Sequence, residues 1–331
     1  MGEALEIAKV LVAPTTKLIE MVGQAIGTVY EPRQKRKLAD ATAYEISVIG
    51  EAMRNAADVP IVYDKNGVAI NSEDFNRLMQ RTGTRLALQE ATKQLNIENI
   101  IDNAYGILEK EEKCSDDPVE QGWINRFFDS VADISDEDLQ NLWGKVLAGE
   151  IKQPNSYSLR TLDTLKNISK QEAELFQKIA PFILERNSSF FLPSSNELLE
   201  KYNIAYRDIM ILDECGLINS SGFVSLNLSV SNTKHEFMYN KTKLVMVYCT
   251  KSDENVISIG EFKLTRAGKE LFALLDSIPN DEYVVDFAEE VEKENHGSVK
   301  ISIYQINSIE EAQINYQLTA LHKFPINSEE K

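Results

Sequence analysis

The chain has 331 residues, and its 52 Asp and Glu against 35 Lys and Arg give a formal net charge of -17. Because an acidic protein repels phosphate backbones, this charge disfavours generic nucleic-acid binding. Hydrophobic residues make up 43% of the chain, which is ordinary for a globular protein and sufficient for a large core without disulfides or metal ions. The length predicts about two domains.

Cysteine usage and hydropathy indicate the compartment. Cys114, Cys215 and Cys249 form no CxxC motif and no even framework, so we expect reduced thiols in a cytoplasmic protein. No secretory signal is evident in residues 1–30, and no run of about 18 apolar residues predicts a membrane-spanning helix. A peripheral location at the inner membrane is the alternative.

Helical periodicity dominates residues 1–155, which we expect to form a helical domain. Within residues 4–30, we expect Pro14 to split the apolar pattern and Thr15 or Thr16 to restart the helix. Further helices are predicted over 33–58, over 73–112 as one long helix or two, and over 118–134.

The stretch from Ser135 to Phe176 carries the clearest helix-start and helix-stop signals. Ser135 is predicted to cap a helix, with Asp138 in the capping-box position. Gly149 and Pro154 bracket the end of that helix.

Two more helices are predicted in the same stretch. Ser158 starts one, with Leu159, Leu162 and Leu165 facing inward. Ser169 starts the other with the sequence S-K-Q-E, which is a capping box. Three short helices with apolar faces bury those faces only against one another, so the stretch is expected to build a compact helical core.

Residues 156–331 predict an α+β domain. Two short helices are followed by strands and then by the helical sequence LTRAGKELFALL, an order that resembles a winged-helix domain. We therefore expect a mainly α protein, with a helical N-terminal domain and an elaborated winged-helix-like C-terminal domain. The predicted elements are helices at 194–203 and 205–214, a strand region at 218–226, paired strands at 242–250 and 256–264, a helix at 281–295, a strand at 299–306 and a helix at 308–324.

The sequence lacks several common catalytic and cofactor-binding motifs. The chain contains no HExxH, GxSxG, GxxxxGK[ST] or GxGxxG motif and only three His, so no cofactor, metal ion or small-molecule substrate is indicated. Cys215 is interpreted as a small buried residue and not as a nucleophile. EFK at 261–263, with Asp253 nearby, is weakly similar to a nuclease pattern. We therefore expect a protein that is not an enzyme.

One candidate contact region follows the first amphipathic segment. A basic cluster and a GxxxG spacing would suit an anionic membrane surface or close helix pairing. A core helix followed by a solvated charged turn is favoured, because Glu20 would face anionic lipid. The candidate contact residues are Gly23, Gly27, Arg33, Lys35, Arg36 and Lys37.

The second candidate region is the winged-helix-like part. Its predicted second helix carries Arg207 against Asp208, Asp213 and Glu214. A helix that reads DNA presents basic residues to the phosphates. This helix therefore favours protein contact or dimerisation, and a DNA-binding regulator is the further alternative.

The sequence LWGKVLAGEIKQPNSYSLRTLDTLKNISKQEAELF resembles the signature of an uncharacterised bacterial family of unknown function. PTTKLIEMVGQAIGTVYEPRQKRK is similar to that family's N-terminal segment. The resemblance implies a structural role for Trp143, Leu147, Gly149, Pro154, Ser158, Leu159 and Arg160.

More distantly, the chain resembles the Abi-alpha proteins of abortive infection. The matching positions are Trp143, Val146, Leu147 and Ala148, then Ile168, Ser169, Glu172 and Ala173, then Leu264, Thr265 and Gly268. The resemblance carries over no catalytic residue. It implies a bacterial or prophage-borne interaction protein in anti-phage defence, whose partner is a protein, either a second copy or another chain. An effector that acts on membranes through residues 1–37 is the alternative.

Overall fold

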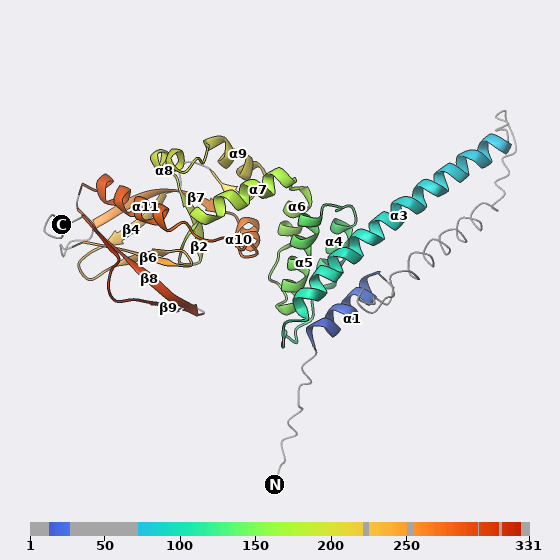
Figure 1. Cartoon of the computed structure of the whole chain (residues 1–331), viewed down its shortest axis with the longest axis horizontal. Coiled ribbons are helices and arrows are strands. Elements are labelled where there is room, and N and C mark those ends of the chain that lie inside the picture. Colours follow the sequence, from blue (N-terminus) through green and yellow to red (C-terminus); the bar gives the residue numbers. More distant parts are fainter. Residues whose placement is uncertain are drawn as a thin grey trace, which may run out of the picture. The chain divides into compact units, whose positions relative to one another are not determined.

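The computed structural model describes residues 13–26, 72–220, 225–249, 255–296, 298–310 and 313–325. The chain divides into two compact units, Met1–Leu162 and Asp163–Lys331, here called unit 1 and unit 2 (Figure 1). The domain boundary between residues 155 and 156 stays a prediction. The helix predicted over 33–58 lies outside the described residues.

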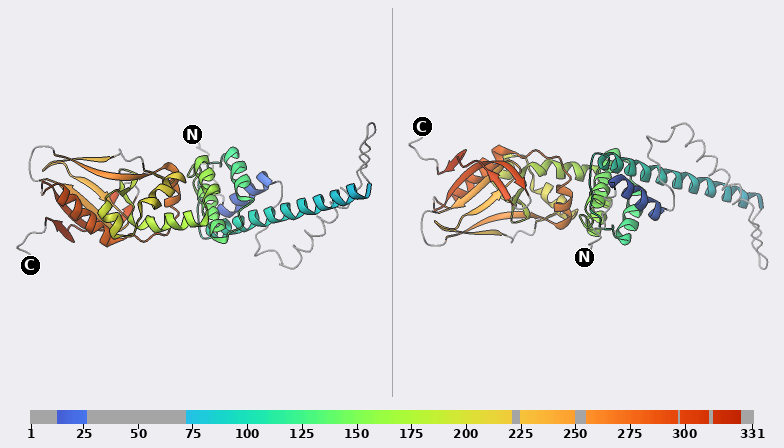
Figure 2. Two further views of the ribbon diagram at one scale, coloured as in Figure 1. Left: turned by 90° about the horizontal axis from the view of Figure 1, so that it is seen from above. Right: turned by 90° about the horizontal axis from the view of Figure 1, so that it is seen from below.

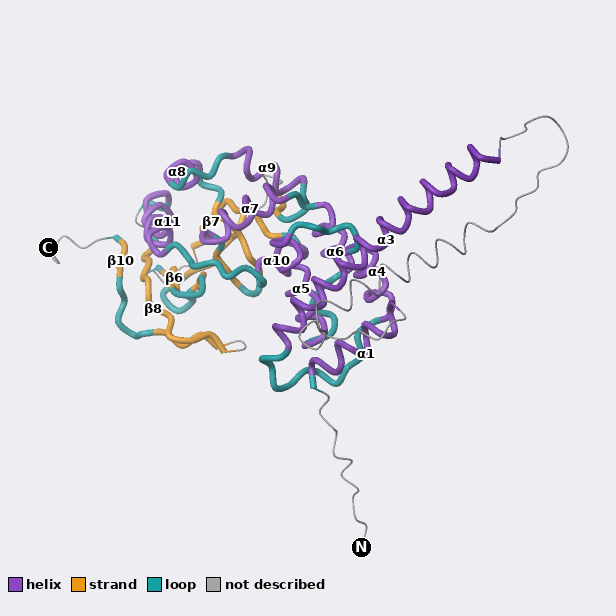
Figure 3. The backbone as a smooth tube through the Cα atoms, turned by 45° about the vertical axis from the view of Figure 1, so that its right-hand side comes forward, coloured by secondary structure: helices purple, strands orange, loops and turns teal. Residues whose placement is uncertain are grey.

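In the described part of unit 1, every regular element is a helix (Figure 3). The first helix begins at Pro14, one or two residues before the predicted restart, because a proline at the first helical position gives up no intrahelical hydrogen bond. Residues 4–12 of the same predicted pattern lie outside the described residues. The long pattern after residue 72 forms one helix. The helices are α1 (Pro14–Ile26), α3 (Ser72–Leu108), α4 (Gln121–Val131), α5 (Glu137–Lys152) and the start of α6 (Leu159–Asn167).

The core of unit 1 forms where α3 and α5 cross. A Cβ atom on Gly144 of α5 would lie 2.6 Å from the Cβ of Asn103 on α3, so the missing side chain permits the close approach. Trp143, the residue before Gly144, is fully buried in this core. Its ring packs edge-on against Phe127, with 5.4 Å between the ring centroids. The cap of α5 is Asp136 and not Ser135, because the Asp136 carboxylate accepts two backbone N–H groups at the helix start.

Lys17 fastens α1 to the rest of unit 1. Its Nζ donates to the carbonyl oxygens of Ser115, Asp117 and Ile151, at 2.8, 2.7 and 3.2 Å. These carbonyls belong to the segment after α3 and to the last turn of α5. Leu18 and Val22 on the same helix are fully buried, so the apolar face of α1 is occupied within unit 1.

Unit 2 combines helices with an antiparallel ten-stranded sheet (Figure 2), which confirms the α+β prediction. The helices are α7 (Lys170–Ile179), η2 (Ala180–Phe182), α8 (Asn196–Lys201), α9 (Tyr206–Glu214), α10 (Arg266–Phe272) and α11 (Asp281–Glu294). The strands are β1 (Leu184–Arg186), β2 (Ser189–Pro193), β3 (Ile218–Asn219), β4 (Ser225–Val230), β5 (Glu236–Tyr239), β6 (Lys243–Tyr248), β7 (Asn255–Leu264), β8 (Lys300–Glu310), β9 (Gln313–Tyr316) and β10 (His322–Phe324).

The strand order along the sheet is β10-β8-β6-β5-β1-β2-β7-β3, with β4 on β7 and β9 on β8. Helix α11 contacts β6, β8 and β10 and lies against that end of the sheet. The capping box predicted at the start of α7 is confirmed, because Ser169 and Glu172 each bond the other's backbone N–H.

Two predictions for unit 2 are wrong. Strands β6 and β7 exist but do not pair with each other, because β6 lies between β5 and β8 while β7 pairs with β2, β3 and β4. The helix predicted over 308–324 is absent from the described residues of that range, which form the end of β8 with β9 and β10. Pairing with the long strand β8 satisfies the backbone there, and such tertiary context overrides local helical preference.

The LTRAG sequence joins α10 to β3. Thr265 caps α10 by accepting from the N–H of Gly268, and its hydroxyl donates to the carbonyl of Gly216 at 2.6 Å. A Cβ atom on Gly268 would lie 2.0 Å from the carbonyl oxygen of Leu217. Real atoms cannot approach so closely, so the helix reaches this position only with glycine there.

We expect Gly268→Ala to lower the free energy of unfolding by about 2 kcal/mol, because the added methyl forces α10 away from Leu217. The matched control is Gly83→Ala on α3, where an added Cβ meets nothing within 4 Å. That control is expected to stabilise slightly, as glycine in a helix interior costs about 0.5–1 kcal/mol. Urea unfolding followed by circular dichroism measures both. Equal stability of the Gly268 variant and the parent chain would contradict the steric argument.

Candidate functional site

The family-like stretch ends in a turn that the buried carboxylate of Glu150 organises. Its Oε1 accepts from the N–H of Asn155 at 2.6 Å, and its Oε2 accepts from the N–H of Tyr157 at 3.0 Å. Asn155 has a left-handed backbone with φ of 69°, which asparagine tolerates better than most residues. The carboxylate therefore holds the chain in its reversal after α5.

Two further contacts close the same turn. A Cβ atom on Gly149 would lie 2.7 Å from the hydroxyl oxygen of Tyr157, so glycine makes room for the ring. Trp123 donates from its indole N–H to the carbonyl of Tyr157 at 2.8 Å. These contacts give the turn a structural explanation.

The family-signature residues occupy different surroundings. Trp143 and Leu147 are fully buried in the core, and Pro154 and Ser158 lie in the turn. Leu159 is 42% exposed, so the prediction that it faces inward is wrong, whereas Leu162 and Leu165 are buried. Leu159 is the first residue of α6, and side chains lean toward the helix start, so it points past the packed surface. Arg160 is also exposed.

Of the six candidate contact residues near the N-terminus, the structure describes Gly23 alone. Gly23 lies on α1 and is half-buried. The other five, namely Gly27, Arg33, Lys35, Arg36 and Lys37, lie outside the described residues.

The N-terminal half of α3 presents apolar side chains to solvent. We call residues 77–95 the free half of α3. Its large apolar residues include Leu78, Met79 and Leu86, which are 49%, 43% and 49% exposed. The other half of the helix, by contrast, buries Ile100, Ala104 and others completely. In Figure 1, α3 continues well beyond the ends of α4 and α5.

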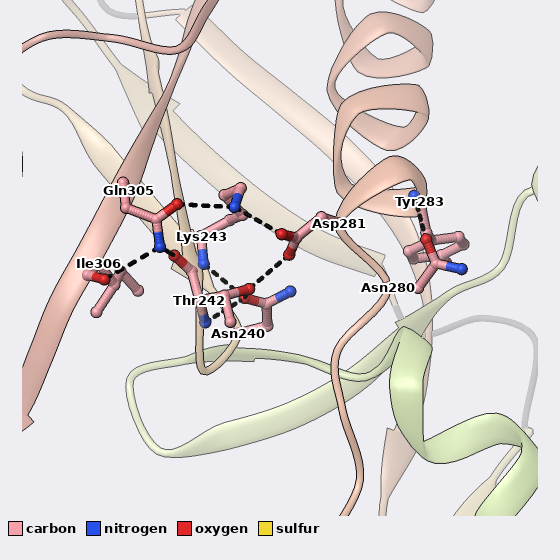
Figure 4. A network of polar contacts seen from close by, with 8 residues as sticks. All are labelled: Asn240, Thr242, Lys243, Asn280, Asp281, Tyr283, Gln305 and Ile306. Atoms are coloured by element: carbon pink, nitrogen blue, oxygen red, sulfur yellow. Dashed lines mark hydrogen bonds and ion pairs between the residues drawn. The ribbon is translucent and has the colours of Figure 1, made fainter.

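Unit 2 contains a partly buried polar network that links two strands to the start of α11 (Figure 4). The Nζ of Lys243 on β6 donates to Asp281 Oδ2 at 2.6 Å and to Gln305 Oε1 on β8 at 2.9 Å. Lys243 is a buried residue, and a buried cation requires such partners to offset its lost hydration. Asp281 opens α11, where a carboxylate also interacts favourably with the helix dipole.

The turn between β5 and β6 completes the network. The Thr242 hydroxyl donates to Asp281 Oδ1 at 2.6 Å, and Asn240 Oδ1 accepts from the N–H groups of Thr242 and Lys243 at 2.8 and 2.7 Å. Burial by itself would raise the pKa of Asp281, but the hydrogen bonds from Lys243 and Thr242 outweigh it and hold that pKa below its usual value. Sequence reasoning missed this network, because its members are distant in sequence.

Cys215 and Glu261, the described candidates for chemistry, both have raised pKa values. Burial, followed by a hydrogen bond to Glu172, raises the pKa of Cys215 to about 12, so its thiol stays protonated at neutral pH. Burial also raises the pKa of Glu261, and Asp253 lies outside the described residues. Across the described ranges, no group of three or more His, Cys, Asp or Glu is arranged to hold a metal ion.

The described helices include none that is both long and apolar enough to cross a bilayer. The fold defines an α+β protein with a helical unit and a sheet-containing unit. The family model described as "Protein of unknown function (DUF2806)" matches residues 80–288, more than half of the chain, so the chain belongs to this family. That range contains the signature stretch and excludes the N-terminal segment of 14–37. No curated protein matches the chain, and no solved structure does.

We expect Glu150→Gln to lower the free energy of unfolding by about 2 kcal/mol, because an amide offers one acceptor oxygen where the carboxylate offers two charged ones. The control is Glu137→Gln on the same helix, whose side chain is exposed and whose loss changes stability by less than about 0.5 kcal/mol. Urea unfolding measures both variants. Indistinguishable midpoints for the two variants would contradict the role assigned to Glu150.

A second prediction concerns pH. Because the folded-state pKa of Asp281 is lowered from 3.8, its stabilising contribution is complete above the unfolded-state pKa and disappears as the pH falls through the lower, folded-state value. The parent chain should therefore be more stable than Asp281→Asn at pH 7 and at pH 5, and the difference should shrink below about pH 4. Urea unfolding at a series of pH values measures it, with Glu294→Gln on the same helix as control. A difference that is constant down to pH 2 would rule out the ion pair as its source.

Proposed function

We propose that this member of the family is a non-enzymatic interaction protein that docks an acidic, amphipathic helix of a partner protein on the free half of α3. The observation that carries the proposal is the exposed apolar stripe of that half. Exposed apolar patches on a folded protein favour contact with another surface.

The stripe continues the buried face of α3. Leu86 and Ala104 are 18 residues apart, which corresponds to about five helical turns, so they point in the same direction. The same spacing relates Leu78 to Asn96 and Thr82 to Ile100. Ile100 and Ala104 are fully buried within unit 1, while Leu78 and Leu86 are exposed. The face that packs on helices in one half is therefore available for a helix in the other.

Charge favours an acidic partner. Arg77, Arg81 and Arg85 are spaced four residues apart and form a stripe beside the leucines. Residues 77–89 contain no Asp or Glu, although the whole chain has a net charge of -17. A helix with carboxylates flanking an apolar seam would complement both features.

We also propose that unit 2 contains a winged-helix-like domain. Helix α7, strand β2, the pair α8 and α9, and strand β3 precede β7, and the sheet order there is β2-β7-β3. A helix–turn–helix followed by an antiparallel strand pair is the arrangement of that domain. Strands β4, β5 and β6 would then be an insertion between its last two strands.

The surface of α9 favours protein over DNA. Tyr206 and Met210 lie on one exposed face of α9, and these residue types are enriched in protein interfaces. Asp213 and Glu214 accompany the single Arg207 on the helix. A helix with this charge would repel phosphates.

The biological setting that we propose is anti-phage defence in a bacterium. Its support is the similarity to Abi-alpha proteins in the Trp143 block, at Ser169 and at Leu264, Thr265 and Gly268. The positions of the last group suit a structural motif, because Thr265 and Gly268 fix α10 against β3. In this setting the partner on α3 would convey the response to infection.

The test places a photoreactive benzoylphenylalanine at Leu86 of the intact chain in phage-infected cells. The expected product joins position 86 to an acidic amphipathic segment of another protein. A chain with Leu78→Glu and the probe at 86 should lose it, because the carboxylate repels the acidic partner. The matched control position is Thr84, which is exposed and lies on the opposite side of the helix, since two residues turn it by about 200°.

Plaque counts provide the second readout. Cells with the intact gene should form at least tenfold fewer plaques with a susceptible phage than cells without it. Leu78→Glu with Leu86→Glu should abolish protection at equal protein level, while Thr84→Glu should keep it. A crosslink only to this same chain or to a second copy, or none at all, would overturn the docking proposal. Equal plating with and without the gene across a phage panel would overturn the defence setting.

A further inference from the structure

Unit 2 contains a cavity that the proposed docking on α3 does not use. Its volume is about 220 Å³, and it lies between the β1–β2 hairpin, the β5–β6 turn and the segment that leads from α10 to α11. Ile183, Phe190, Phe272 and Pro279 form its apolar walls. An apolar cavity of about 150 Å³ accommodates benzene, so this one has room for a substituted ring.

The cavity contains a buried hydrogen-bond donor without a partner. Asn240 lines it and is only 7% exposed. Its Oδ1 accepts from the N–H groups of Thr242 and Lys243, which identifies the oxygen, because backbone N–H groups can only donate. The other amide atom is therefore the NH₂ group. This Nδ2 has no hydrogen-bond partner among the described residues, and in Figure 4 it points away from the turn.

A second orphaned polar atom lies in the same cavity. The Oγ of Ser277 is buried and has no hydrogen-bond partner among the residues that the structure describes. Buried polar groups in folded proteins are nearly always paired, and each one left unpaired costs about 1–3 kcal/mol. A ligand in the cavity with both an acceptor and a donor would provide the partners that these two atoms lack.

The charges around the cavity favour a neutral ligand. Glu185 and Tyr239 are cross-strand neighbours on β1 and β5, and burial, followed by the nearby Glu185 carboxylate, raises the pKa of Tyr239 to about 12. Lys241 lines the cavity but is itself an exposed residue. The buried interior of the cavity thus offers an amide donor, a hydroxyl and aromatic walls. Neither Glu185 nor Lys241 places a buried, unpaired charge in it.

We propose that this cavity binds a small, neutral, ring-containing amide. Its carbonyl oxygen accepts from Asn240 Nδ2, its N–H donates to Ser277 Oγ, and its ring packs against Phe190 and Phe272. Asn240 also fixes the turn that carries Thr242 and Lys243 to Asp281. Occupancy therefore stabilises the turn and the start of α11 together, and a bound ligand raises the melting temperature of unit 2.

The experiment titrates the full chain with benzamide and with toluene, using ligand-detected NMR and thermal unfolding. The two probes share the ring and differ in the amide group. Benzamide is expected to bind saturably and about tenfold more tightly than toluene, as two satisfied hydrogen bonds would give. It should also raise the melting temperature in a concentration-dependent way.

Three variants assign the binding to the cavity. Asn240→Asp keeps the acceptor oxygen of the turn and replaces the donor, so benzamide affinity should fall at least tenfold. Ala273→Leu, at an exposed position on the cavity rim, should block both probes while leaving the circular dichroism spectrum unchanged. The control Ile278→Ala removes an exposed side chain beside Ser277 and should bind as the parent chain does.

Two outcomes would overturn the proposal. One is equal affinity for benzamide and toluene, or no saturable binding of either. The other is benzamide binding that survives both Asn240→Asp and Ala273→Leu. Neither outcome bears on the helix docking at α3, which the crosslinking experiment tests separately.

Discussion

Strand β7 is the element on which the fold of unit 2 depends, because it pairs on both of its edges. Residues near its end pair with β2 on one edge and β3 on the other, and its first six residues pair with β4. The change of neighbours falls at Gly260, where a Cβ atom would lie 2.2 Å from the Oγ of Ser194. The chain then passes directly into the Thr265 cap and Gly268, so one continuous segment joins the sheet to α10.

At the other end of the sheet, the Lys243 network joins the strands to α11. Lys243 is buried on β6, which lies between β8 and β5, and the carboxylate that neutralises it opens α11. The Asp281 side chain is 46% exposed, so only the Lys243 side of this ion pair is buried, and loss of the carboxylate would leave a buried cation without its charged partner. The ion pair therefore fixes where α11 starts relative to the strands. Asn240 belongs both to this network and to the cavity wall. A ligand bound in the cavity would therefore contact the turn that carries the network.

Unit 1 uses one helix for two purposes. The C-terminal half of α3 supplies buried residues such as Ile100 and Ala104, and Gly144 of α5 allows the close crossing that buries them. The free half repeats the same helical face beyond the ends of α4 and α5, which cover the other half among the described residues (Figure 1). The helical backbone of α3 runs without a break from Leu78 and Leu86 to the buried residues of the core. This continuity gives the proposed docking surface a fixed geometry.

The sequence by itself determined the features that depend on near neighbours. The Ser169 capping box, the inward Trp143 and Leu147, and the helix at 281–295 follow from spacing over one or two turns. Only the tertiary structure decided which strands pair, because β6 and β7 look like a hairpin locally while their true partners are distant in the chain. For the same reason, no local sequence motif predicts the two candidate sites. The exposure of Leu86 and the unpaired Asn240 amide depend on which surfaces the rest of the chain covers, and no local pattern specifies that.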